Sequence, residues 1–373
     1  MMRQRGFTMI ELLITVALST LVGILIYTVF IEQTRAYRLQ TDMGNMQQNL
    51  RVAMEMVTRD VATAGWGVGY NGSTWGIGGQ DGDENSGMYA IWVRDNFPVG
   101  SGHDAIELTM MDPDRTTWGY TATDVSEQCS TTVITFDADD AAVAGNFSSA
   151  GPNSEIICYA PVGMGGRPVS YIWTVDGTGD TSSGTVPVAA NTTTDFSNEC
   201  TGSLPAHMAC GPVMHQAYYI DDNGSDGFGI GSSEVPVLYL VPDVTVADIA
   251  GGYPHANDIP VALGIEDLQF QVCQAGLGRD CEDDANWESG FNMDANSSGT
   301  SDWWNLQAVR VLMTARTLRP DLERTAVSTP IDIEPLDVYV PTATLDSYHR
   351  RVARTEVTSR NAMGTWQMMN TPF

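Results

Sequence analysis

The sequence contains no lysine: all 18 of its basic residues are arginines, against 46 acidic residues and a formal net charge of −28. Nonspecific nucleic-acid binding depends on clustered lysine and arginine side chains that contact phosphates. The composition therefore disfavours a nucleic-acid partner. We attribute the acidic surface to the solubility of an exported domain, rather than to cation binding or salt adaptation.

The sequence also lacks the local motifs of the common hydrolases and nucleotide-binding enzymes. It has no G-x-S-x-G, no H-E-x-x-H and no phosphate-binding loop. Its five histidines are scattered, and acidic pairs such as Asp139 and Asp140 are too common in this composition to indicate glycoside hydrolysis. We predict that the protein is not an enzyme and needs no cofactor.

The cysteines lack a C-x-x-C pair, which argues against a zinc-thiolate site. Their number is even and all follow the N-terminal apolar segment, which indicates disulfides in an oxidising compartment. Short separations favour Cys200 with Cys210 and Cys273 with Cys281, which leaves Cys129 with Cys158. This pairing is one of the combinations that six cysteines allow, so it is a preference. The candidates are Cys129, Cys158, Cys200, Cys210, Cys273 and Cys281.

Residues 7–31 form a long apolar segment with one charged side chain, Glu11. A helix of roughly 20 apolar residues spans a bilayer, so this segment is long enough. The short basic N-terminus, with Arg3 and Arg5, favours a cytoplasmic start and places the remaining chain outside. The alternative is an ordinary signal peptide or uncleaved anchor, but no small-x-small cleavage site follows Ile31.

The sequence Gly-Phe-Thr-Met-Ile-Glu-Leu-Leu at residues 6–13 resembles the class III signal of type IV prepilins. The resemblance implies that a prepilin peptidase cleaves between Gly6 and Phe7, that the Phe7 amine is methylated, and that the apolar helix is retained. Residues 1–6 would then be the leader. A carboxylate is costly in a membrane. The resemblance implies that Glu11 pairs with the charged N-terminus of a neighbouring subunit and sets axial register.

A helical pattern continues through residues 32–65, with apolar residues three or four positions apart. Gly65 and Gly67 predict its end. We expect a continuous stalk whose second half packs on a sheet; the alternative is an unrelated juxtamembrane coiled coil. The apolar positions are Leu39, Met43, Met46, Leu50, Ala53 or Met54, Val57, Val61 and Ala64.

Short β-branched and aromatic runs, bounded by Gly, Pro or Asp, recur after residue 66 and predict strands. The expected fold class is α+β: a long N-terminal helix packed on an antiparallel, sheet-rich head at residues 66–373 with long loops. The predicted strands are residues 104–111, 131–137, 155–160, 169–175, 216–220, 235–241, 263–273 and 305–317, with a further strand-like piece at 349–361.

Two regions of the chain resemble the minor pilins of the PilW type and the related J-type pseudopilins of type II secretion. One is Arg-Asp-Val-Ala-Thr-Ala-Gly-Trp at residues 59–66; the other comprises the strand-like segments at 263–273, 305–317 and 349–361. The resemblance implies an inner-membrane protein with a periplasmic head that later enters a pilus. Its implied partners are other minor and major pilins, the prepilin peptidase and an inner-membrane assembly platform. The alternatives are a type II secretion pseudopilin or an adhesin head mounted on a pilin helix.

The segment 221–228 is rich in carboxylates and glycines, as calcium loops are. Its spacing does not match an EF-hand, so we expect an acidic turn. Calcium binding is the alternative, with Asp221, Asp222 and Asp226 as the candidate ligands.

Overall fold

A computed structural model gives the fold of this chain. It describes residues 8–66, 91–94, 97, 102–112, 117–120, 133–136, 138–148, 155–160, 169–189, 208–221, 235–242, 258–274, 281, 283, 287–289, 306–321 and 348–358.

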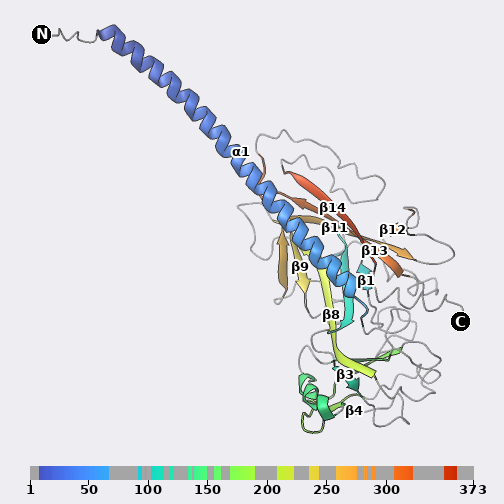
Figure 1. The fold of residues 1–373 in the computed structure, drawn as a ribbon. Coiled ribbons are helices and arrows are strands. Elements are labelled where there is room, and N and C mark those ends of the chain that lie inside the picture. Colours follow the sequence, from blue (N-terminus) through green and yellow to red (C-terminus); the bar gives the residue numbers. More distant parts are fainter. Residues whose placement is uncertain are drawn as a thin grey trace.

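One uninterrupted helix, α1 (Met9–Thr63), forms the N-terminal part of the described chain and projects from the head (Figure 1). Thr8 caps its start, where the hydroxyl oxygen accepts a hydrogen bond from the Glu11 N–H at 3.4 Å. The helix ends at Thr63, and Gly65 follows its C-cap residue with a φ of 79°, which suits a residue without a side chain. The helix expected at 32–65 is therefore continuous with the apolar segment before it.

The head is built from antiparallel strands, as expected from the sequence. The largest sheet follows the order β1 (Ile91–Arg94), β2 (Ala105–Met111), β8 (Met208–Asp221), β5 (Glu155–Ala160) and β6 (Val169–Thr174). Three further strands join it: β3 (Thr117–Tyr120) and β9 (Val237–Val241) pair with β8, and β10 (Ile259–Leu263) pairs with β9.

A second sheet of four strands has the order β12 (Trp287–Ser289), β11 (Ile265–Gln274), β13 (Leu306–Arg316) and β14 (Arg350–Val357). A small third sheet pairs β4 (Val133–Thr135) with β7 (Thr185–Pro187), and a 3-10 helix spans Ala138–Asn146. The longer predicted strands are confirmed. The run predicted at 216–220 is wrong in length, because β8 begins at Met208 and continues through Gly211 and Pro212.

The main core lies where α1 meets both large sheets. The second half of the helix supplies Met46, Leu50, Ala53, Val57 and Val61, all buried. These positions belong to the predicted apolar stripe, whereas Leu39 and Met43 at its beginning are half-buried. Burial of one such aliphatic side chain contributes about 1.5–3 kcal/mol, so this short contact is enough to fix the helix to the head.

A second core lies apart from α1, near the far end of β8, where Figure 1 shows β3 and β4. It is formed by aromatic and aliphatic side chains, including Phe136 and Phe147, which stack with ring centroids 5.9 Å apart. Cys158 of β5 and Cys210 of β8 are buried in it. The long β8 strand therefore belongs to both cores.

The disulfides differ from the preferred pairing. Cys273 and Cys281 are bonded, as expected. Cys210, however, is bonded to Cys158, so its expected partner Cys200 and the Cys129–Cys158 pair were wrong. The reason is strand order: β5 lies beside β8 with Cys158 directly opposite Cys210. Cys129 and Cys200 lie outside the described residues.

Candidate assembly site on the N-terminal helix

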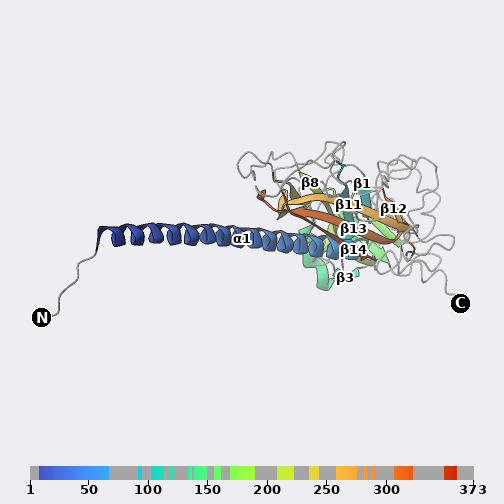
Figure 2. The same cartoon turned by 90° about the horizontal axis from the view of Figure 1, so that it is seen from above.

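The first half of α1 is an exposed apolar rod. It is the one described helix that is long and apolar enough to cross a membrane, and its most apolar stretch buries no residue against the head. Figure 2 shows this half extending beyond the sheets. Large apolar side chains point outward around its whole circumference, from Met9 at 84% exposure to Ile31 at 40%. So much exposed apolar surface requires lipid or partner helices.

Glu11 is the only charged residue in this apolar half of the described helix. It lies in the first turn, where the helix dipole favours a negative charge. Its side chain is exposed and has no described partner. A carboxylate at this depth is costly without a partner, which makes Glu11 a functional candidate. Gly6 and Phe7, the predicted processing residues, lie outside the described residues.

The serine and threonine hydroxyl groups of the apolar half donate hydrogen bonds within the helix itself. Thr15 donates to the Leu12 carbonyl at 2.8 Å, and Ser19 donates to the Thr15 carbonyl at 2.7 Å. Thr20 and Thr28 make equivalent bonds. Such bonds supply the partners that water supplies elsewhere, so these residues are compatible with a lipid or helix-packed environment.

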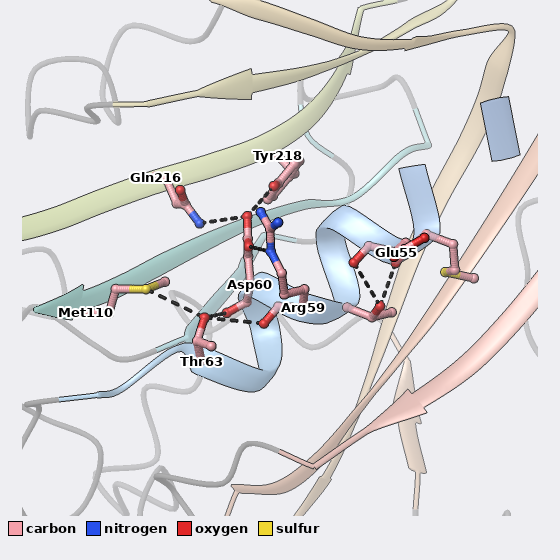
Figure 3. A network of polar contacts seen from close by, with 9 residues as sticks. Glu55, Arg59, Asp60, Thr63, Met110, Gln216 and Tyr218 are labelled. Carbon is pink, nitrogen blue, oxygen red and sulfur yellow. Dashed lines mark hydrogen bonds and ion pairs between the residues drawn. The ribbon is translucent and has the colours of Figure 1, made fainter. Parts of the chain in front are cut away.

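The opposite end of α1 is fixed to the head by Asp60, which is buried (Figure 3). One carboxylate oxygen accepts from Tyr218 Oη at 2.5 Å and from Gln216 Nε2 at 3.1 Å. The other accepts from Arg59 Nε at 2.9 Å. Asp60 therefore pairs with Arg59 within its own helix and with two side chains of β8.

The hydrogen bonds around Asp60 affect the protonation of Tyr218. Burial, followed by its hydrogen bond to the Asp60 carboxylate, raises the pKa of the Tyr218 phenol. The phenol therefore stays a hydrogen-bond donor over the whole physiological range. The bond to Asp60 also raises the pKa of the Arg59 guanidinium, so Arg59 stays positively charged.

Backbone contacts complete the junction between helix and head. The Gly65 N–H donates to the Thr109 carbonyl at 2.9 Å, and the Met111 N–H donates to the Trp66 carbonyl at 2.8 Å. The chain therefore leaves α1 directly along β2. Together with Asp60, these bonds orient the exposed half of the helix relative to the head.

The calcium candidates are only partly described. Asp221 ends β8 and is buried, while Asp222 and Asp226 lie outside the described residues. Among the residues that the structure describes, no group of three or more His, Cys, Asp or Glu side chains is arranged to hold a metal ion. Calcium binding at this segment stays a prediction.

Comparison with known proteins identifies the N-terminal segment. The prokaryotic N-terminal methylation motif matches residues 1–27. None of the curated proteins matches the sequence. Among solved structures, the chain is similar to a type IV-like pilin from Thermus thermophilus at 10% identity and a TM-score of 0.32, over 85% of this chain and 96% of that one. The chain thus carries a prokaryotic N-terminal methylation motif that leads into a membrane-length helix.

Proposed function

We propose that this chain is a minor pilin of the PilW type, which takes part in the priming and assembly of a type IV pilus. Its role is structural rather than catalytic. The observation that carries the proposal is the methylation motif at residues 1–27, continued by an exposed apolar helix with a single carboxylate. A filament subunit needs a processing motif and an apolar helix that packs against its neighbours. The folded head then forms the part of the subunit outside this helix packing.

In the proposed pathway, the chain first resides in the inner membrane with its head in the periplasm. The basic residues Arg3 and Arg5 stay in the cytoplasm. Prepilin peptidase cleaves between Gly6 and Phe7, which removes two positive charges and creates a new amine at Phe7. An inner-membrane assembly platform then transfers the helix from lipid to the filament, where other minor and major pilins surround it.

Glu11 determines register in this proposal. The helix surface from Met9 to Ile31 is apolar on all sides, so apolar packing alone allows several axial positions. A single carboxylate has one favourable partner, the charged amine of a neighbouring Phe7. A misaligned subunit leaves that charge unpaired in a medium of low polarity, which is strongly unfavourable.

The test is intact-mass and N-terminal peptide analysis of protein from a strain with its native prepilin peptidase. We expect a chain that begins at methylated Phe7. A chain that still begins at Met1, or one cut after Ile31, contradicts the proposal and assigns the protein to anchored or secreted proteins.

Two alternative functions share this architecture, so further measurements have to distinguish them from the pilus proposal. A type II secretion pseudopilin has the same processing but assembles into a short periplasmic filament, so it is missing from filaments sheared from the cell surface. Recovery of this chain in sheared pili supports the pilus proposal. An adhesin head binds a surface ligand when incorporated, and a glycan array with the processed full chain in detergent tests that alternative.

A further inference from the structure

A groove lies between the second half of α1 and the strand β14. It has a volume of about 720 Å³. The helix lines it with residues on the flank of its buried face, and β14 lines it with Arg351, Ala353 and Thr355. The helix passes beside β14 in both views (Figures 1 and 2). The remaining lining residues are Gln47, Gln48, Leu50, Arg51, Met54, Glu55 and Thr58.

The strand β14 is an edge of its sheet within the described part of the chain. Every residue from Arg350 to Val357 pairs with β13, and β13 is the only described strand that pairs with it. In an antiparallel pair, alternate residues direct their N–H and C=O groups away from the partner strand. An edge of this kind is a template on which an extended segment can add as a further strand.

The groove has a distinct chemical character. Its floor is apolar, because Leu50 is buried and Met54 and Ala353 are half-buried. Its rim carries two exposed guanidinium groups, Arg51 and Arg351, against one carboxylate, Glu55. Two positive charges are therefore directed at one groove in a chain whose formal net charge is −28.

Neither Arg51 nor Arg351 forms an ion pair with any residue that the structure describes. Their neighbours on the other face of β14 differ: Arg350 pairs with Glu266, and Arg354 pairs with Glu356 at 3.1 Å. Guanidinium groups bind carboxylates with two parallel hydrogen bonds, so the unpaired arginines favour an acidic ligand. The arginines therefore favour an acidic ligand, and the strand edge favours an extended one.

We propose that the β14 edge and the α1–β14 groove bind an extended acidic segment of another protein, which adds to the sheet as a strand. Alternate side chains of the added strand face the groove, where carboxylates meet Arg51 and Arg351 and apolar side chains cover the floor. This inference goes beyond the proposed function, because it assigns a partner surface to the head irrespective of the filament in which the protein assembles.

The test uses the full chain in detergent micelles and a fluorescent octapeptide, Glu-Thr-Val-Thr-Glu-Thr-Val-Thr, blocked at both ends. Its Glu and Val side chains lie on one face of a strand. We expect saturable binding in fluorescence anisotropy. Two control peptides separate the contributions: lysine in place of glutamate removes the charge match, and N-methylation of the four central residues removes the hydrogen-bond donors needed for strand pairing. We expect each change to weaken binding at least about tenfold.

Matched variants of the protein locate the site. The double change Arg51→Glu and Arg351→Glu reverses both rim charges and is expected to weaken binding at least about tenfold. Arg38→Glu reverses an exposed charge on the same helix outside the groove and is expected to leave binding within about twofold. Equal loss in both variants, unchanged binding in the double variant, undiminished binding of the N-methylated peptide, or no binding of the octapeptide overturns the proposal.

Discussion

Asp60 is the residue that joins the helix to the sheet. Its carboxylate accepts hydrogen bonds from a tyrosine and an amide on β8, and it lies next to an arginine of its own helix. Hydrogen bonds to a charged acceptor contribute about 1.5–3 kcal/mol each, more than bonds between neutral groups. The junction therefore depends on one side chain more than on any single apolar contact.

We expect Asp60→Ala to lower the free energy of unfolding by about 2–4 kcal/mol, because it leaves the buried Tyr218 hydroxyl and Gln216 amide without their acceptor. Denaturant unfolding of the full chain in detergent measures the change. Glu55→Ala, an exposed position five residues earlier on the same helix, serves as control and is expected to change stability by less than about 0.5 kcal/mol. Equal effects of the two substitutions contradict the role of Asp60.

The same network predicts alkaline sensitivity. The pKa of Tyr218 is raised in the folded chain from its ordinary value of 10.0, so above about pH 10 the unfolded state releases this proton first. Stability is then fully present below pH 10 and falls as the pH rises toward the folded-state pKa. Tyr218→Phe has no phenol to ionise, so its unfolding free energy is expected to vary less between pH 9 and 11 than that of the parent chain. Identical pH profiles refute the prediction.

At Glu11 the expected effect is on assembly and not on folding. Glu11→Ala removes the only charge of the exposed apolar half, far from the buried contacts of the head. We expect an unchanged melting temperature of the head and loss of the chain from sheared filaments. Glu32→Ala, on the same exposed helix but beyond the apolar segment, is the control and is expected to assemble. Normal incorporation of the Glu11 variant excludes the register role.

At the scale of elements, two glycines differ in whether their position requires a residue without a side chain. Gly44 lies inside the helix, and a side-chain carbon added there meets no atom within 4 Å. Gly264, between β10 and β11, has a φ of 78°, and an added carbon would lie 2.7 Å from the Arg316 carbonyl oxygen. One glycine is thus a weak point of the helix, and the other is required by the turn.

We predict opposite effects of alanine at these two glycines. Gly44→Ala is expected to stabilise α1 by about 0.5–1 kcal/mol, because alanine restricts the unfolded chain and fits the helix. Gly264→Ala is expected to destabilise the head by more than about 1 kcal/mol through backbone strain and the contact with Arg316. Thermal unfolding of each variant in detergent gives the sign, and a stabilised Gly264 variant would contradict this reading of the turn.

The elements that sequence patterns identify are the long ones. The helix and the strands β11 and β13 have regular apolar periodicity, and both kinds of element were predicted near their observed bounds. Five strands of three to five residues were missed, because such short strands carry little periodicity: β1, β3, β7, β10 and β12. β8 was predicted too short, because Gly211 and Pro212 resemble a strand end although β5 pairs with them.

The candidate site was predictable only at its N-terminal side. Glu11 stands out because a charge is rare in an apolar run. Asp60 does not, because its main partners Gln216 and Tyr218 are 156 and 158 residues away in the chain. The disulfide partner of Cys210 was missed for the same reason, since sequence separation does not indicate which strands lie side by side.

At the scale of the whole molecule, the Cys158–Cys210 bond joins β5 to β8 within the second core. It closes a sequence separation of 52 residues, against 8 residues for Cys273–Cys281. Loop-closure entropy predicts a loss of about 4 kcal/mol for the double alanine variant of the first bond and about 2.5 kcal/mol for the second. Guanidinium unfolding midpoints measured side by side test this order, and a larger loss for the shorter loop contradicts it.

The position of β8 has a mechanical consequence. A pull on the exposed end of α1 reaches the head through Asp60 and passes to Gln216 and Tyr218 in the middle of β8. From there tension runs along the strand backbone to Cys210 and across the disulfide to β5. Each link in this load path is a regular element or a side-chain bond, so traction on the exposed helix is carried along β8 to the second core.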